Sequence, residues 1–298
     1  MYNVYEQVDR NKKRSTLIVI IFALFVTLVV YVLGRMFDYG PSFIGVALIV
    51  SGIFSFVGYW YSDKIVLGIS GARPATKVEN NLFVSVAENI SIGAGIPLPK
   101  LFVIDDTAPN AFATGRDIDH AVVCITSGLL EKLNRTELEG VVAHEISHIR
   151  NYDMRLMSVV SVLVGMITLV ADWMLRVRVR GRDREGGNVG AVFFILGIIL
   201  VLLSPIIAQL IQLAISRRRE FLADSGSALI TRQPSGLISA LRKISADQEP
   251  LEAANKATAH LYIVNPLKGN QNTVGWFANL FNTHPLVEDR IKALEGLK

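Results

Sequence analysis

The chain has 298 residues, of which 51% are hydrophobic and 19% are charged, and its formal net charge is +4. Its mean hydropathy of +0.41 is unusual for a soluble globular protein and favours a membrane protein. The single cysteine excludes an internal disulfide. Since the positive charge comes mostly from basic residues beside apolar segments, it gives no reason to expect nucleic-acid binding.

Four segments without charged residues account for the hydropathy. They cover residues 15–34, 39–62, 156–171 and 186–216. About 20 helical residues cross a bilayer core, so the first two are long enough, the third is short, and the fourth is longer than a crossing requires. Pro205 lies within the fourth and can bend it. We therefore expect a mainly α membrane protein with four transmembrane or hairpin helices.

Basic residues before the first segment predict its orientation. Arg10, Lys12, Lys13 and Arg14 precede it, and positively charged flanks favour the cytoplasmic side. The apolar segment is long for a secretory signal and has no small-residue cleavage site after it, so it is interpreted as an uncleaved anchor. Two crossings then return the chain, which predicts that residues 63–155 are cytoplasmic.

The loop between the third and fourth segments disagrees with this topology. It carries arginines at 176, 178, 180, 182 and 184, which a full crossing would place outside. Either the first helix sets the topology, which we favour, or the two segments form a hairpin that does not fully cross. Both alternatives bring the two flanks of the hairpin out on the same side.

The segments divide the chain into four regions. Residues 1–62 are the predicted N-terminal membrane anchor, and residues 63–155 form the first part of a catalytic domain. Residues 156–216 are the membrane hairpin, and residues 217–298 form the second part of the catalytic domain.

A small α+β unit is predicted within the first part of that domain. Apolar residues at 78, 82, 86 and 90 have helical spacing, and glycines and prolines follow them. Three short apolar runs, at 101–104, 110–115 and 121–125, are typical of strands of a small antiparallel sheet. Cys124 lies within the last run and is expected to be a packed thiol.

The sequence His144-Glu145-Ile146-Ser147-His148 is the strongest indication of chemistry. On a helix the two histidines lie on one face, so both imidazoles can bind one metal ion. Glu145 can then deprotonate a water bound to the metal. Thr136 and Glu139 have capping-box spacing and predict the start of this helix.

Glu220 is the strongest candidate for a third metal ligand. It follows the fourth apolar segment closely, so the hairpin would return it to the side of His148. Asp224, four residues on, could accept a hydrogen bond from a ligand histidine. Alternatively, both acids pair with the arginines at 217–219. The histidines at 120, 260 and 284 are the other candidate ligands.

These motifs, with Arg-Arg-Glu-Phe-Leu-Ala-Asp and Thr-His-Pro at 283–285, closely resemble the HtpX family of membrane zinc endopeptidases, relatives of the CAAX prenyl endoproteases within the gluzincins. The resemblance implies a cytoplasmic zincin-like domain that binds one Zn²⁺. It further implies a multi-pass protease of the bacterial inner membrane that acts in the stress response on misfolded or damaged membrane proteins and unfolded polypeptides. Functional overlap with the protease FtsH is also implied.

The resemblance assigns roles to individual residues. It implies that the zinc ligands are His144, His148 and Glu220, the catalytic base is Glu145, the supporting carboxylate is Asp224, the pair near the reacting carbonyl is His284 and Arg290, and the substrate-binding strand is Asn110, Ala111, Phe112 and Ala113. Alternatively, Phe112 is a core aromatic, and His284 only caps the helix that Pro285 begins.

Two other classes of protein remain to be separated from a protease. A metal transporter would need ligands near the middle of its spans, where this chain has glutamines but no histidine or cysteine. A silent scaffold would usually lack the base or a ligand.

Residues 246–282, with Trp276, Phe277 and Phe281, form either an interfacial lid or part of the core.

Overall fold

The computed structural model describes residues 4–36, 40, 43–162, 217–254, 258–264, 266 and 285–297. Most of the third apolar segment, the arginine-rich loop and the fourth apolar segment lie outside the described residues. His284 and most of residues 246–282, including Trp276, Phe277 and Phe281, also lie outside them.

The described chain is mainly helical. The helices are α1 (Val4–Met36), α2 (Phe43–Trp60), α3 (Ser62–Ile69), α4 (Asn81–Ala94), α5 (Ser127–Lys132), α6 (Arg135–Arg150), α9 (Arg217–Thr231), α10 (Pro234–Ala246) and α12 (Val287–Glu295), with 3-10 turns η1 (Ile118–His120) and η2 (Ala259–Leu261). The strands are β1 (Arg73–Pro74), β2 (Lys100–Ile104), β3 (Ala111–Thr114) and β4 (Val122–Thr126). A further helical segment at 153–162 follows α6.

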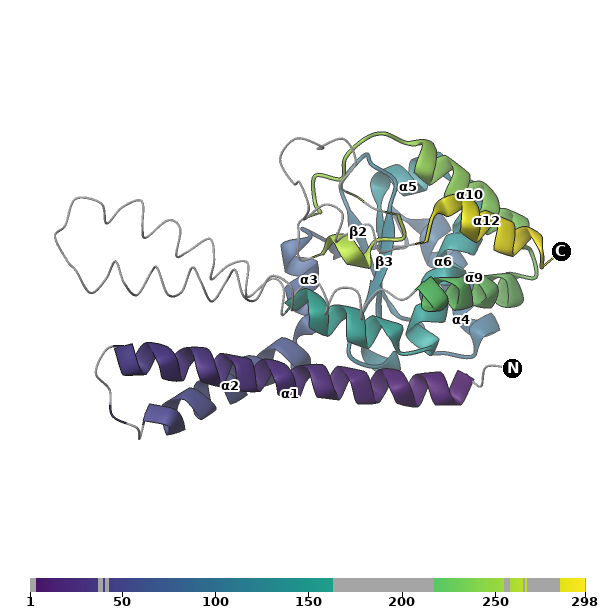
Figure 1. Cartoon of the computed structure of the whole chain (residues 1–298). Helices are drawn as coiled ribbons and strands as arrows, with labels where there is room; N and C mark the ends of the chain where they lie inside the picture. Colours follow the sequence, from purple (N-terminus) through teal and green to yellow (C-terminus); the bar gives the residue numbers. More distant parts are fainter. Residues whose placement is uncertain are drawn as a thin grey trace.

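The first two apolar segments form α1 and α2, which lie against each other below the rest of the molecule in Figure 1. Within the described residues no single helix meets the length and hydropathy criteria for a membrane span. Residues 44–60 and 62–69, bent by 73° between them, meet these criteria together by length and composition. The expectation of four membrane helices therefore stays a prediction.

The sheet is mixed, so the expected antiparallel sheet is wrong. Its strand order is β1-β2-β4-β3, and β2 pairs with β4 in parallel, whereas β1–β2 and β3–β4 are antiparallel. All five residues of β4 are buried, as expected for a central strand paired on both sides. β3 therefore lies at one edge of the sheet.

The capping box of α6 begins two residues earlier than expected. Asn134 Oδ1 accepts a hydrogen bond from the Glu137 backbone at 3.0 Å, and Glu137 Oε2 accepts one from the Asn134 backbone at 2.8 Å. Thr136 and Glu139 do not form the predicted box. The box of Asn134 and Glu137 is favoured because Lys243 and Ser239 of α10 also donate to the Glu137 carboxylate. Sequence spacing cannot indicate this tertiary contact.

α6 is the centre of the fold. It packs against α4, α9 and α10, while β3 and β4 lie across it from these helices. α10 approaches closely at Gly140, where an added Cβ would lie 2.6 Å from the backbone nitrogen of Leu237. Cys124 is fully buried beside Phe112 and Tyr262, which confirms that it is a packed core thiol. A buried helix surrounded on several sides holds its own side chains in fixed positions.

Candidate active site

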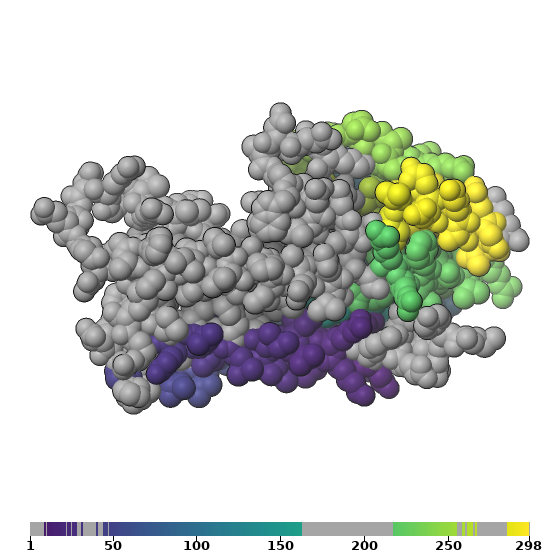
Figure 2. All heavy atoms as spheres, viewed as in Figure 1, coloured from purple at the N-terminus to yellow at the C-terminus, as the bar shows by residue number. Residues whose placement is uncertain are grey.

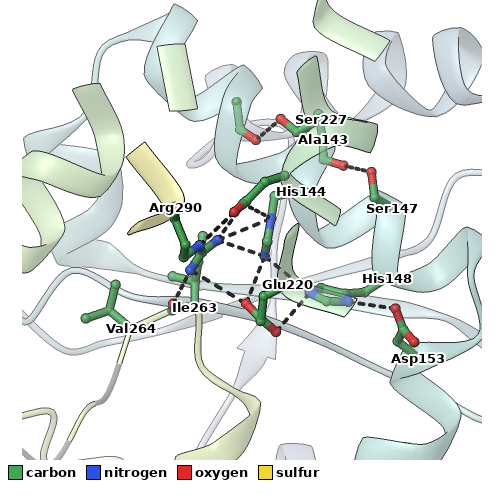
Figure 3. Close-up of polar contacts among 12 residues, drawn as sticks. Ala143, His144, Ser147, His148, Asp153, Glu220, Ser227, Ile263, Val264 and Arg290 are labelled. Carbon is green, nitrogen blue, oxygen red and sulfur yellow. Dashed lines mark hydrogen bonds and ion pairs between the residues drawn. The ribbon is translucent and has the colours of Figure 1, made fainter. Parts of the chain in front are cut away.

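The two histidines of α6 lie side by side and are almost inaccessible to solvent. Their ring centroids are 4.7 Å apart, and the Nε2 atoms of His144 and His148 are 3.2 Å apart. The relative solvent exposure is 1% for His144 and 4% for His148. The four-residue spacing places both rings on one face of the helix, as the sequence predicts. Figure 3 shows the two rings side by side.

α9 brings Glu220 to the same point. Its Oε2 lies 3.8 Å from His144 Nε2, and its Oε1 lies 3.6 Å from His148 Nε2. One donor atom from each of these three residues lies within 4.8 Å of the other two. His120 does not join them, since its ring bonds to Asp117. Two imidazoles and one carboxylate are a donor set that suits zinc and leaves a position for water.

A carboxylate lies behind each histidine. Asp224 Oδ1 is 2.9 Å from His144 Nδ1, and Asp153 Oδ2 is 3.1 Å from His148 Nδ1. An ionised carboxylate only accepts hydrogen bonds, so each of these contacts favours a proton on Nδ1. Both Nε2 lone pairs then point toward each other and Glu220, and Arg290 Nη2 lies 3.3 Å from His144 Nε2. A cation bound between the two Nε2 atoms and Glu220 would relieve the repulsion among them.

Arg290 of α12 balances the charge of the acids. It donates to Asp224 through Nε at 2.9 Å and through Nη2 at 2.7 Å, and to the Ile263 carbonyl through Nη1 at 3.0 Å. Nη1 also lies 3.6 Å from Glu220 Oε2. Arg290 thus contacts both Asp224 and Glu220.

Glu145 points from α6 toward the edge strand β3. Its carboxylate is buried and accepts a hydrogen bond from the Ala113 backbone. Burial, together with the nearby charge of Glu220, raises the pKa of Glu145 to about 7. A carboxylate with a pKa near neutrality can both take up and release a proton.

The pKa values of the two histidines move in opposite directions. Burial lowers the pKa of His144 to about 4. Burial also acts to lower the pKa of His148, but the hydrogen bond to Asp153 and the charge of Glu220 outweigh it and raise the pKa to about 9. The negative groups around His148 therefore favour a positive charge at this position, which either a proton or a metal ion can supply.

The strand expected to bind substrate lies next to the histidines. Asn110 and residues 111–113 are buried in and beside β3. Phe112 packs edge-on against Tyr262, with ring centroids 5.1 Å apart, so its side chain belongs to the core. Ile263 donates a backbone hydrogen bond to the Ala111 carbonyl at 3.0 Å on the outer edge of the strand. His284 lies outside the described residues.

No pattern in the sequence indicated Asp153 as a partner of His148. The chain bends between the two residues, since Tyr152 adopts a left-handed φ of 58° and a new helical segment begins at Asp153. This reversal turns Asp153 back toward His148, five residues earlier in the chain. Five-residue spacing places two side chains on different faces of a continuous helix, so no periodicity could have indicated the contact.

Known proteins resemble this chain over nearly its whole length. The pattern of peptidase family M48 matches residues 78–298. A "Protease HtpX homolog" of Dictyoglomus thermophilum is 44% identical over 296 residues, which cover 98% of this chain and 94% of that protein. The one of Tropheryma whipplei is 42% identical over 294 residues, covering 99% and 98%. S. mikatae Ste24p superposes with a TM-score of 0.49 and 18% identity, covering 92% of this chain and 62% of that one.

Proposed function

Since the chain belongs to peptidase family M48 and is a metalloprotease, we propose that it is a zinc endopeptidase of the bacterial inner membrane. Its substrates are misfolded or damaged membrane proteins and unfolded polypeptides, which it cleaves at the cytoplasmic face as part of a stress response. Its function overlaps with that of the protease FtsH. The observation that carries the proposal is the convergence of His144, His148 and Glu220 beside Glu145.

His144, His148 and Glu220 are the residues that would hold one zinc ion. Zinc, when bound there, would lower the pKa of a water molecule and polarise the scissile carbonyl. The carboxylate of Glu145 can accept a proton from a water molecule and pass it to the leaving amine. Asp224 holds the ring of His144, and Arg290 keeps Asp224 in place.

The edge position of β3 supports an extended substrate. An added strand pairs through backbone hydrogen bonds, which gives broad specificity for the substrate sequence. The backbone of Ala113 already reaches Glu145, so a peptide along residues 110–113 would pass directly beside the base. The contact of Ile263 with Ala111 lies on the same edge, so a peptide that pairs there must displace it.

Exposed apolar side chains on the first two helices support membrane attachment. Leu24 and Leu28 of α1 and Ile49 and Ile53 of α2 are each more than half exposed. Figure 2 shows the surface of α1 extending along one side of the molecule. Large apolar side chains exposed in this way are unusual on soluble monomers where they gather on one surface, and they are typical of contact with lipid.

The decisive experiment separates zinc binding from catalysis. Glu145→Gln in the full chain, purified in detergent, should retain stoichiometric zinc, because the amide leaves the three ligands unchanged. Cleavage of an unfolded membrane-protein substrate should fall at least about a hundredfold, because the general base is lost. Zinc content and initial cleavage rates are measured on the same samples.

Two variants complete this test. Glu139→Gln makes the same chemical change on the outer surface of α6, where Glu139 pairs with Arg135, and should leave both quantities unchanged. His148→Ala should lose zinc and cleavage together. Undiminished proteolysis by the Glu145→Gln protein would contradict the assignment of the base.

A further inference from the structure

We propose that Asp153 is a positioning residue for His148, and that Asn11 of α1 holds Asp153 in place. Docking of the N-terminal helix onto the catalytic domain is then a condition for tight zinc binding. The inference rests on the proposed zinc site. Asn11 and Asp153 are 142 positions apart in the chain.

A continuous set of contacts carries this proposal. Asn11 Nδ2 donates to Asp153 Oδ1 at 2.7 Å and to the Asn151 carbonyl at 3.0 Å, which uses both of its protons. The other oxygen of Asp153 lies 3.1 Å from His148 Nδ1, as Figure 3 shows. Asn11 is 2% exposed and Asp153 is 0% exposed, so water does not replace these contacts.

The turn that presents Asp153 is also held by α1. Tyr152 adopts φ 58°, a left-handed conformation that costs a residue with a Cβ about 1–2 kcal/mol. Lys12 Nζ lies 4.3 Å from the centre of the Tyr152 ring, a cation–π contact. Two consecutive residues of α1 thus contact the same turn. Asp153, the residue after Tyr152, contacts the candidate metal ligand His148.

Asp153 also connects the two helices that carry the ligands. Arg219 Nε lies 3.5 Å from Asp153 Oδ1, and Arg219 immediately precedes Glu220 on α9. A buried carboxylate is stable only where hydrogen bonds and opposite charge compensate for its lost hydration. Asn11 and Arg219 provide this compensation on one side of Asp153, while its other oxygen faces His148.

The contact with His148 has a direct consequence for metal binding. An imidazole can rotate and can carry its proton on either nitrogen. Holding the proton on Nδ1 fixes the ring plane and directs the Nε2 lone pair toward Glu220, 3.6 Å away. Loss of such a partner typically weakens metal affinity by about 10- to 100-fold.

The test measures zinc affinity by competition with a chelator, using the full chain in detergent. Asp153→Asn should weaken zinc binding by about 10- to 100-fold. Asn11→Ala should weaken it by a smaller factor, because Asp153 keeps Arg219. Thr16→Val provides a matched control on α1, since the exposed Thr16 hydroxyl donates to the Lys12 carbonyl of its own helix. This variant should bind zinc like the parent protein.

A double variant distinguishes positioning from general loss of structure. If Asn11 acts through Asp153, Asn11→Ala adds nothing to the loss of affinity in a chain that already carries Asp153→Asn. Two independent structural defects would instead add. Melting temperatures of the metal-free variants are measured alongside to identify unfolding.

Each outcome bears on a separate claim. Unchanged zinc affinity in Asp153→Asn overturns the role of Asp153, and additive losses in the double variant overturn the link through Asn11. A parent protein that binds no zinc contradicts the proposed function itself, which the two preceding results leave intact.

Discussion

Arg290 shows how strongly the candidate site depends on one buried charge. It contacts both Asp224 and Glu220 and is 1% exposed. The paired contact of its guanidinium with Asp224 uses the planar geometry that distinguishes arginine from lysine. Two buried carboxylates near one another would repel without it, so Arg290 makes the acidic half of the site possible before any metal binds.

Replacement of this arginine should therefore be costly. Arg290→Met leaves Asp224 and Glu220 buried without their cation, which we expect to destabilise the metal-free protein by about 3–5 kcal/mol. Thermal unfolding followed by tryptophan fluorescence would record this as a fall in melting temperature of about 6–20 °C. Arg290→Lys should recover only part of the loss, because an ammonium cannot make the paired contact.

An exposed arginine provides the matched comparison. Arg242 pairs with Glu295 at 3.0 Å, but both side chains are largely exposed. Arg242→Met should therefore change stability by less than about 1 kcal/mol. If the two substitutions lowered the melting temperature equally, the buried charge of Arg290 would not be what stabilises the site.

At the level of elements, Glu137 joins the start of α6 to α10. Its carboxylate accepts from Lys243 Nζ at 2.8 Å and from the Ser239 hydroxyl at 2.6 Å, in addition to the Asn134 backbone. Burial acts to raise the pKa of Glu137, but the bonds from Lys243 and Ser239 outweigh it and hold this pKa below its ordinary value. The ionised form is therefore the one that the fold stabilises.

This direction fixes the expected pH dependence. Because the pKa is lower in the folded protein, the stabilisation is fully present above the unfolded pKa and is lost as pH falls through the folded pKa. Glu137→Gln should lower stability at pH 7 by about 1–2 kcal/mol, given the partial exposure of Lys243. The difference in melting temperature between parent and variant should shrink below about pH 4. A difference that is constant from pH 7 to pH 3 would contradict this assignment.

The sequence predicts the elements better than their arrangement. Apolar runs at 101–104 and 121–125 predicted β2 and β4, because burial of a strand leaves a local pattern. Their parallel pairing was not predicted, since strand order depends on contacts between distant residues. The same limit explains the misplaced capping box, where two overlapping motifs compete and the distant Lys243 favours one of them.

The candidate site divides in the same way. His144, Glu145 and His148 are predictable because one helix fixes their relative positions. Glu220 is predictable only through the expectation that a hairpin returns the chain to the same side. Asn11 and Asp153 were not predictable, because nothing local relates the first helix to the turn after α6.

At the scale of the whole molecule, α1 has two different environments along its length. Near its start, Asn11 is buried against the turn that follows α6, whereas Leu24 and Leu28 are exposed beyond it. A single helix thus extends from the candidate metal centre into an apolar surface. This arrangement favours a bilayer surface close to the site, where a membrane-protein substrate would emerge.

The membrane topology can be tested with a single cysteine. Asn188 lies at the start of the fourth apolar segment, just after the arginine-rich loop, and four crossings place it outside the cytoplasm. An impermeant thiol reagent should therefore label Asn188→Cys in intact cells. The parent protein should remain unlabelled, because its one cysteine, Cys124, is fully buried. Lys77→Cys, exposed on the predicted cytoplasmic part, should react only after permeabilisation.

The opposite result would have a specific meaning. His148 and Glu220 lie on the two flanks of this hairpin and converge whether or not its helices cross the bilayer, so the geometry of the site is compatible with both topologies. If Asn188→Cys reacts only after permeabilisation, the hairpin does not cross, and the five arginines of the loop follow the positive-inside tendency. The protease would then cross the bilayer only through α1 and α2.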